Sequence, residues 1–346
     1  MSNSNLNAAK TAKKDEFYTQ MTDIERELQH YWPHFQGKVV LCNCDDPYES
    51  NFFKYFAFHF NQLGLKRLIC TSYNGSSIQG SELMINFGEE VKKAKKTAYK
   101  VEITEVLDCS GNRTVDLSDV QVLLQNNKNL LSELKTGDFR DPECIELLKQ
   151  ADIVVTNPPF SLFREYVGLL IKYDKKFLII GNQNALTYKE IFPLIQNNKV
   201  WTGYRFGEMK FRVPANTKPR KTRYWVDSTG QKWRSLGNAM WLTNLDIDKK
   251  HQFLNLTKTY NPEEYPTYDS FDAINVHRVQ DIPMDYPGIM GVPITIIDKY
   301  NSEQFELIGE ANHGCDNEYD LFKPTINGKQ IFKRILIRNK KTIEII

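Results

Sequence analysis

Short apolar runs alternate with amphipathic helical patterns along the first two thirds of the chain. Three runs, at 38–42, 67–71 and 152–156, have the length and apolar content of buried strands. Between the first two, phenylalanines recur at helical spacing from Ser50, a good N-cap residue, to Gly64, a good C-terminal stop. Strand, helix and strand in this order form the repeating unit of a parallel sheet.

The same alternation continues through the middle of the chain. We expect strands over 101–107 and 177–180, and a helix for which Asp141 is the cap. Ser161 is expected to cap a further helix. The pattern predicts an α/β domain with a doubly wound, mostly parallel sheet over residues 15–245.

Both ends of the chain differ from this middle part. The first fourteen residues are small, polar and rich in lysine, which predicts a disordered tail over 1–14. After residue 245 prolines are more frequent, and the apolar runs at 294–297, 305–308 and 331–337 are short and isolated. They predict a smaller, mostly β module over 246–346, which is a candidate for target recognition.

Composition places the chain among globular proteins. Of its 346 residues, 41% are hydrophobic and 25% are charged. No apolar run approaches the roughly 20 residues that cross a bilayer, and the N-terminus lacks the apolar core of a secretory signal. The six cysteines form no CxxC pair, so we interpret them as reduced thiols and expect a cytoplasmic protein.

Charge is unevenly distributed, although the formal net charge is only +2. Residues 201–261 carry a net +8, residues 262–320 a net −11 and residues 321–346 a net +6. Two interpretations follow from this pattern. The basic blocks form a localised surface for a polyanion, or the whole pattern is a solvated surface of uneven charge.

The residues that carry chemistry follow the strand 152–156. Asn157, Pro158, Pro159 and Phe160 come at its carboxyl end, where ligands bind in open α/β sheets. Adjacent prolines cannot continue a strand ladder and force a rigid, extended turn. The turn directs the Asn157 side chain and the Pro158 carbonyl into the crevice as two acceptors, and an aromatic ring follows them.

Two acceptors beside an aromatic ring suit the exocyclic amine of a planar base. Such an amine is a poor nucleophile because its lone pair is delocalised into the ring. Acceptors on both of its hydrogens favour a tetrahedral nitrogen whose lone pair attacks an electrophilic methyl group, and Phe160 stacks on the base. We therefore predict that 157–160 is the catalytic loop. The alternative is a Pro-Pro turn that only ends a strand.

With this motif and its surroundings, the chain resembles the EcoRI-type adenine-specific DNA methyltransferase family. The stretches that carry the resemblance occur in the family's order: 14–20, 40–47, 50–56, 137–140 and 155–161. The resemblance implies a class I methyltransferase fold, which is Rossmann-like. It also implies S-adenosylmethionine as the methyl donor and N6 of adenine in DNA as the acceptor.

The resemblance further implies which residues hold the cofactor. The residues at its methionine end are Phe17, Tyr18 and Thr19. The turn after the first strand also contacts the cofactor, through Asn43, Asp45, Asp46 and Pro47. This turn replaces the glycine-rich turn that is usual in methyltransferases. Asp138 and Phe139 match the segment that holds the cofactor adenine, and the carboxylate accepts from its amino group. Tyr73 is a further candidate or an ordinary aromatic residue at a strand end.

The run 204–234 is the main candidate for DNA contact, because nine basic residues alternate there with aromatic ones. The basic residues that we assign to DNA are Arg205, Lys210, Arg212, Arg220, Lys221 and Arg223. The alternative is a basic hairpin on the solvent face. A second candidate is the basic stretch 323–341.

Several classes of chemistry are not indicated. No HExxH or zinc-ligand spacing, no phosphate-binding GxxxxGK[ST] motif and no Pro-Cys dipeptide occurs in the sequence. We expect no metal and no membrane, with duplex DNA and a cognate restriction endonuclease acting on the same site as partners. The alternatives are methylation of another amino or amide nitrogen (cytosine N4, an RNA base or a protein glutamine), and an inactive DNA-binding protein on the same scaffold.

Overall fold

The structure is a computed structural model that describes residues 18–44, 50–73, 98–106, 130–213, 215, 217–311 and 324–342. The chain divides into two compact units. The first consists of Met1–Ala185 and Gly203–Leu245, and the second of Leu186–Thr202 and Asp246–Ile346. In the described part of the chain no helix is long and apolar enough to cross a membrane.

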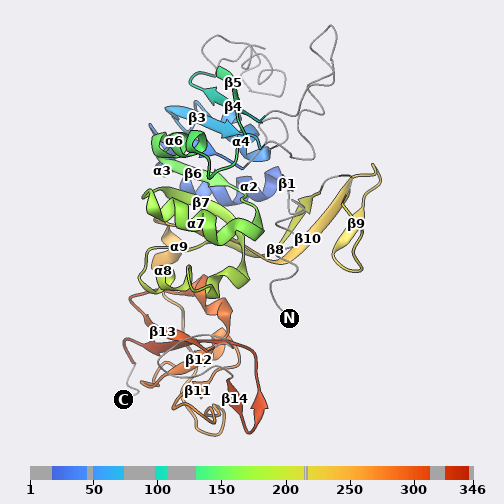
Figure 1. The fold of residues 1–346 in the computed structure, drawn as a ribbon. Coiled ribbons are helices and arrows are strands. Elements are labelled where there is room, and N and C mark those ends of the chain that lie inside the picture. The colour runs from blue at the N-terminus through green and yellow to red at the C-terminus, as the bar shows by residue number, and fades with distance from the viewer. Residues whose placement is uncertain are drawn as a thin grey trace. The chain divides into compact units, whose positions relative to one another are not determined.

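A ten-stranded sheet forms the centre of the first unit (Figure 1). Its strand order is β1-β8-β10-β7-β6-β2-β3-β4-β5, and β9 pairs with β10. The strands are β1 (Tyr18–Thr19), β2 (Val39–Cys42), β3 (Arg67–Thr71), β4 (Ala98–Ile103), β5 (Leu130–Leu134), β6 (Ile153–Thr156), β7 (Lys176–Asn182), β8 (Trp201–Arg212), β9 (Tyr224–Val226) and β10 (Lys232–Thr243).

The sheet is mixed, so the expected mostly parallel sheet is found only at its centre. Strands β3, β2, β6 and β7 are parallel neighbours, with Val40 opposite both Leu68 and Ile153. On one side β4 and β5 run antiparallel, and on the other side β10 runs antiparallel to β7. Parallel neighbours need a crossover connection, and the chain forms α4 (Asn51–Phe58) between β2 and β3 and α7 (Phe163–Lys172) between β6 and β7.

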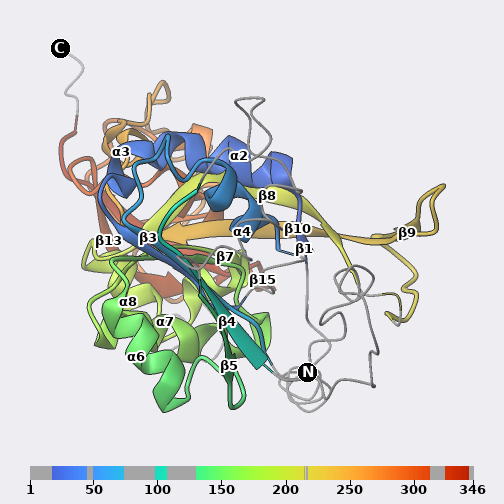
Figure 2. The same ribbon diagram turned by 90° about the horizontal axis from the view of Figure 1, so that it is seen from above.

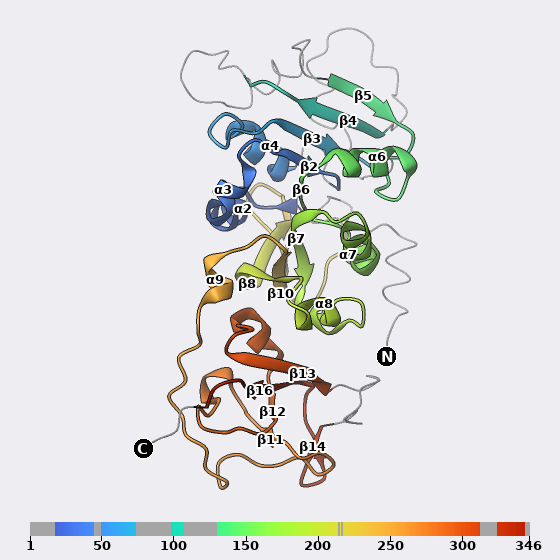
Figure 3. The same ribbon diagram turned by 90° about the vertical axis from the view of Figure 1, so that its left-hand side faces the viewer.

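Helices cover both faces of this sheet. Figure 3 shows α2, α3 and α4 on one face and α6 and α7 on the other. Their bounds are α2 (Met21–Leu28), α3 (Trp32–Phe35), α4 (Asn51–Phe58), α6 (Pro142–Gln150) and α7 (Phe163–Lys172), and the 3₁₀ turns η1 (Gln29–Tyr31) and η3 (Phe160–Leu162) adjoin α3 and α7. Strands β2 and β6 are buried along their whole length, because parallel strands between two helical layers meet no water.

The helix starts partly confirm the expected caps. The Ser50 hydroxyl accepts from the backbone N–H of Phe52 at 3.1 Å, as an N-cap should. The cap expected at Ser161 is wrong: the N-cap position of α7 is Leu162, because the 3₁₀ turn η3 precedes the helix and contains Ser161. Asp141 is the N-cap residue of α6, as expected, with Pro142 first in the helix. Its carboxylate accepts from the Thr136 hydroxyl, however, and not from an N–H group of α6.

The chain reverses its direction across the sheet at β2, and this reversal positions the candidate site. From β2 the chain passes to β3 on one side and later to β6 on the other, so the carboxyl ends of these parallel strands lie at one edge. Asn43, Ser72 and Asn157 follow directly after β2, β3 and β6. Ligands bind at this place in open α/β sheets.

The second unit is built around a four-stranded sheet of order β11-β12-β16-β13. Its strands are β11 (Ile274–Asn275), β12 (Met290–Val292), β13 (Phe305–Ala311) and β16 (Arg334–Asn339), and a separate ribbon pairs β14 (Thr325–Ile326) with β15 (Lys329–Gln330). The helical elements are α8 (Phe192–Gln196), α9 (Asp248–His251), η5 (Val279–Asp281) and η6 (Ile294–Lys299), and the 3₁₀ helix η4 (Gln183–Thr187) contains the last residues of the first unit's segment and the first of the second unit. The run 294–297, expected as β structure, is therefore a 3₁₀ helix that follows Pro293.

Candidate active site

The loop Asn157-Pro158-Pro159-Phe160 leaves the end of β6 at the edge described above. Asn157 and Phe160 are half-buried, and Pro158 is buried. The Pro159 carbonyl accepts from the backbone N–H of Leu162 at 2.9 Å, which closes the turn η3. Among the described residues none donates to the Pro158 carbonyl, which is the acceptor that the sequence assigns to the target amine.

Thr19 holds the side chain of Asn157. The Asn157 amide nitrogen donates to the Thr19 hydroxyl at 3.4 Å, although the two residues lie 138 positions apart. Thr19 is 4% exposed, and its own carbonyl accepts from the Asn51 amide at 2.7 Å. The contact directs the Asn157 nitrogen to Thr19, and the oxygen is the acceptor atom of the same amide.

Asn43 is fixed from inside the molecule. The Tyr166 hydroxyl on α7 donates to the Asn43 side-chain oxygen, and both residues are buried. Phe139 packs edge-on against the Tyr166 ring, with centroids 5.0 Å apart. The sequence predicts that Asn43 and Phe139 hold the cofactor. Tyr166 contacts both of them from α7, the helix that follows the predicted catalytic loop.

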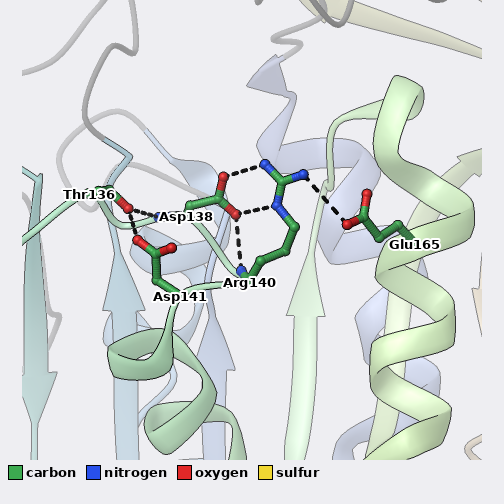
Figure 4. A network of polar contacts seen from close by, with 5 residues as sticks. All are labelled: Thr136, Asp138, Arg140, Asp141 and Glu165. Carbon is green, nitrogen blue, oxygen red and sulfur yellow. Dashed lines mark hydrogen bonds and ion pairs between the residues drawn. The ribbon is translucent and has the colours of Figure 1, made fainter.

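Asp138 is bound by Arg140 through two parallel contacts (Figure 4). The Arg140 Nε donates to Oδ1 at 2.8 Å and Nη2 donates to Oδ2 at 2.5 Å. Glu165 of α7 lies 3.5 Å from the other terminal nitrogen of Arg140. The hydrogen bond from Asp138 and the charges of both carboxylates raise the pKa of Arg140, so the guanidinium stays charged.

The loop that carries Asp138 lies directly against the end of β3. Gly137 has φ +70°, and a Cβ there would lie 1.9 Å from the Ser72 carbonyl oxygen, so only glycine fits. Next to Ser72, the Thr71 hydroxyl is buried and has no hydrogen-bond partner among the described residues. The close approach brings Asp138 and Phe139 to the edge of the sheet where Asn43 and Asn157 also lie.

The remaining predicted cofactor residues have different placements. Tyr18 pairs with Arg212 across β1 and β8, and the guanidinium carbon of Arg212 lies 5.3 Å from its ring centroid. Tyr73 is half-buried just beyond β3. Four predicted residues lie outside the described residues: Phe17, Asp45, Asp46 and Pro47.

The six predicted DNA-contacting residues fall into two groups. Arg205 lies 3.4 Å from the buried Asp23 of α2, and its backbone N–H donates to the buried Glu27 at 2.8 Å. The four residues with exposed side chains are Lys210, Arg220, Lys221 and Arg223, while Arg212 is half-buried. Arg205 of β8 therefore contacts α2 inside the molecule. The exposed residues come later in the run 204–234.

Sequence reasoning missed Tyr166, Arg140 and Glu165. Tyr166 lies on the buried side of an amphipathic helix, where a tyrosine is indistinguishable from ordinary core in the sequence. Arg140 lies two positions from Asp138, and this spacing was the one available indication of the pair. No group of three or more His, Cys, Asp or Glu side chains in the described part of the chain is arranged to hold a metal ion.

These features define the class of protein. Polar side chains converge at the carboxyl ends of β2, β3 and β6 in a partly parallel sheet, around the loop Asn157-Pro158-Pro159-Phe160. The sequence predicts this loop as the catalytic loop of a methyltransferase that acts on an adenine amine. Residues 5–340 match the family model of the adenine-specific methyltransferase EcoRI. The chain belongs to that family and is an adenine-specific DNA methyltransferase.

Curated relatives agree with this membership. The type II methyltransferase M.EcoRI of Escherichia coli is 49% identical over 340 residues, which cover 97% of this chain and 96% of that protein. The type II methyltransferase M.MgeORF184P of Mycoplasma genitalium is 38% identical, over 97% of this chain and 99% of its own length. M.MpnI of Mycoplasma pneumoniae, also a type II methyltransferase, is 38% identical over 88% of this chain and 84% of its own length. No solved structure matches the chain.

Proposed function

We propose that the enzyme transfers a methyl group from S-adenosylmethionine to N6 of an adenine flipped out of duplex DNA. The observation that carries the proposal is the orientation of Asn157. Its amide nitrogen donates to Thr19, and we infer that its oxygen accepts from the substrate together with the Pro158 carbonyl. These two oxygens match the two hydrogens of one exocyclic amine.

The chemistry follows from this pair of acceptors. Each oxygen accepts one N–H of the adenine amine, which draws the nitrogen lone pair out of conjugation with the ring. The lone pair would then attack the methyl carbon of the donor as its bond to sulfur breaks, which would leave a neutral thioether. The nitrogen would lose one proton to solvent after the new bond forms. Phe160 keeps the base plane in place by stacking. No protein atom forms a covalent bond to the base.

The residues at the sheet edge fit S-adenosylmethionine, which when bound supplies a methyl group on a positively charged sulfur. Asp138 offers a carboxylate acceptor beside the aromatic Phe139, a pair that suits an adenine ring with an amino group. The buried Thr71 hydroxyl has unused hydrogen-bonding capacity at the end of β3. We infer that Asp138, Phe139 and the turn after β2 hold the cofactor, and that the sheet is the doubly wound sheet of class I methyltransferases.

Arg140 is compatible with this role for Asp138. The guanidinium donates to both oxygens of the carboxylate, and the Arg140 backbone N–H donates to Oδ1 at 3.0 Å. Arg140 thus fixes the orientation of the carboxylate that we assign to the cofactor adenine.

Base flipping implies contacts to the DNA backbone, because a stacked adenine is out of reach of the loop. We assign these contacts to the run beyond Arg205. The residues concerned are Lys210, Arg212, Arg220, Lys221 and Arg223. Arg205 is left out because its guanidinium pairs with Asp23. Lysine and arginine on phosphates fix the register of the protein on the duplex.

We infer that the module 246–346 takes part in target recognition. Its ribbon β14–β15 turns through Asn327 and Gly328, both with positive φ, and Asp269 accepts from both backbone N–H groups at 2.8 and 2.9 Å. Phe332, just beyond the ribbon, is 87% exposed. A rigid two-stranded ribbon can enter the major groove of DNA, where sequence is read.

We further propose that the enzyme works in the cytoplasm as the methylating partner of a restriction endonuclease that acts on the same site. The support is that the three relatives are type II methyltransferases. DNA from cells that express the enzyme should resist one restriction endonuclease and remain sensitive to others. Uniform sensitivity would refute the pairing.

The test of the proposed function is sequencing of DNA from expressing cells at single-base resolution. We expect N6-methyladenine in one enriched motif. Asn157→Ala should reduce turnover on the order of 100-fold, since it removes a preorganised polar contact to the reacting group. Donor binding, measured by calorimetry on the purified protein, should stay unchanged. Wild-type protein that leaves DNA unmodified, or full turnover in the variant, would overturn the proposal.

A further inference from the structure

The basic run forms a projecting arm in the first unit. The arm, defined as residues 208–236, consists of the end of β8, the short strand β9 and the start of β10. Figures 1 and 2 show it extending to one side of the sheet, with β9 near its far end. In the register of the arm, Trp225 lies opposite Trp233, and Tyr224 lies opposite Arg234.

Large apolar side chains are exposed on β9. Trp225 is 37% exposed and Val226 is 51% exposed. The rings of Trp225 and Trp233 are nearly parallel, with an interplanar angle of 8° and centroids 6.3 Å apart. Lys210 Nζ lies 5.9 Å from the Trp225 ring centroid, within the range of a cation–π contact. An exposed tryptophan held in one orientation indicates a binding surface, because the same ring in the core would be more stable.

The turn between β9 and β10 is organised by Asp227. Its carboxylate accepts from the Thr229 N–H at 2.9 Å, the Gln231 N–H at 3.1 Å and the Trp233 Nε1–H at 2.7 Å. The Thr229 hydroxyl also donates to it, at 2.6 Å. Trp233, which stacks with Trp225, is thereby fixed before any partner arrives. A preformed surface loses little conformational entropy on binding.

The charge of the arm favours an anionic partner. Arg220, Lys221 and Arg223 are exposed, and burial together with the nearby Arg220 charge lowers the pKa of Arg234 to about 10. The two positive charges repel each other, and an anionic partner relieves this repulsion. The carboxylates of the arm are engaged internally, since Asp227 holds the turn and Glu208 accepts from the Ser235 hydroxyl at 2.5 Å.

We propose that this arm binds duplex DNA beside the methylated adenine, with Trp225 packed against bases or sugars and Arg220 and Lys221 on phosphates. A duplex from which a base has been flipped out exposes base faces next to phosphates, so it satisfies both kinds of residue on the arm at once. A second copy of this chain would bring two basic arms together. The inference rests on the proposed function, in which DNA is the substrate. It adds that the arm, and Trp225 in particular, contacts that DNA.

The test uses the full-length protein and a short fluorescent duplex that contains the methylated motif. Trp225→Ala should weaken binding at least about tenfold, the usual effect of losing one stacking side chain. Trp225→Phe, which keeps an aromatic face, should recover most of the affinity. Phe253→Ala is the matched control, because it removes another exposed aromatic side chain (58% exposed) outside the arm, and it should bind as the wild type does.

Wild-type affinity in Trp225→Ala would overturn the inference. The inference would also be overturned if the wild type were a dimer in solution and the Trp225→Ala variant a monomer. The arm would then be a contact between two copies of the chain. Donor affinity of the Trp225→Ala protein, measured alongside, should match the wild type and shows that the fold is intact. The proposed function fails on a different result, namely wild-type protein that transfers no methyl group to DNA, whatever the arm binds.

Discussion

Thr19 contacts Asn157, in addition to its predicted position at the methionine end of the cofactor. Thr19 is buried, and its hydroxyl accepts from the amide of Asn157, the residue that we propose to be catalytic. An asparagine amide can place either nitrogen or oxygen toward a substrate, and a fixed acceptor on one side decides the orientation. Thr19 is therefore a positioning residue for Asn157.

Thr19→Val should lower kcat about fivefold, the effect expected when one neutral hydrogen bond is lost. The valine keeps the shape of the side chain, so the buried contacts remain. Thr19→Ser keeps the hydroxyl and should retain kcat. Steady-state kinetics with DNA and donor varied separately would show the change in kcat, with little change in KM for the donor. Equal kcat in Thr19→Val and wild type would refute the role.

We expect Arg140 to affect cofactor binding by orienting the Asp138 carboxylate. Arg140→Lys keeps the charge and loses the two-point contact, so KM for the donor should rise about tenfold while kcat changes less. Glu165→Gln is the control, because its contact with Arg140 is long and half-exposed, and it should change KM less than about twofold. An unchanged KM in Arg140→Lys would mean that Asp138 is oriented without the guanidinium.

At the scale of elements, the turn of the arm depends on one carboxylate. Hydrogen bonds from Thr229 and Trp233 lower the pKa of Asp227 to about 2. In the unfolded chain an aspartate titrates near about 4. The ionised carboxylate therefore stabilises the turn fully above about pH 4, and this contribution is lost as the pH falls toward 2.

Asp227→Asn should abolish this pH dependence and loosen the turn at neutral pH, because a neutral amide accepts more weakly than a carboxylate. The NMR resonance of the Trp233 indole N–H reports the contact directly. In the wild type it should shift as the pH is lowered below about 4, and in Asp227→Asn it should already be shifted at neutral pH. An indole resonance that is the same in both proteins would show that Asp227 does not hold the turn.

Other elements differ from the sequence-based expectation for local reasons. The helix expected to reach Gly64 ends at Phe58, and the strand expected over 101–107 spans Ala98–Ile103. Local preference locates an element, but its ends depend on which backbone groups find partners. The strand is fixed by antiparallel pairing with β3, in which Leu68 lies opposite Ile103.

At the scale of the whole molecule, DNA affinity should depend steeply on salt. Each phosphate contact releases counterions, so the logarithm of the affinity falls with a slope of about −0.9 per contact against the logarithm of salt concentration. The double variant Arg220→Ala with Lys221→Ala should make the slope less steep by about two. Titrations by fluorescence anisotropy at several salt concentrations give the slopes directly.

Arg205→Ala is the matched control for this experiment. Its guanidinium pairs with Asp23, so its removal should lower thermal stability and leave the salt slope unchanged. A slope that becomes less steep in Arg205→Ala would place DNA at the base of β8. An unaltered slope in the double variant would remove Arg220 and Lys221 from the DNA surface.

The sequence by itself determined the features that depend on short stretches of chain. The strands β2, β3, β6 and β7 follow from apolar runs, and Asn157 to Phe160 follow from a motif at the end of one of them. Family membership also rests on ordered short matches, which the comparison over residues 5–340 confirmed. Such features are encoded locally, by the polarity and backbone restrictions of neighbouring residues.

The tertiary structure alone decided which distant residues meet. Thr19 reaches Asn157 across 138 positions, and Tyr166 reaches Asn43 across 123. It also decided that Arg205 pairs within the fold while Arg220 and Lys221 stay exposed, although all three are basic residues of one run. These outcomes depend on strand order and on packing between elements, and a single sequence carries no local record of either.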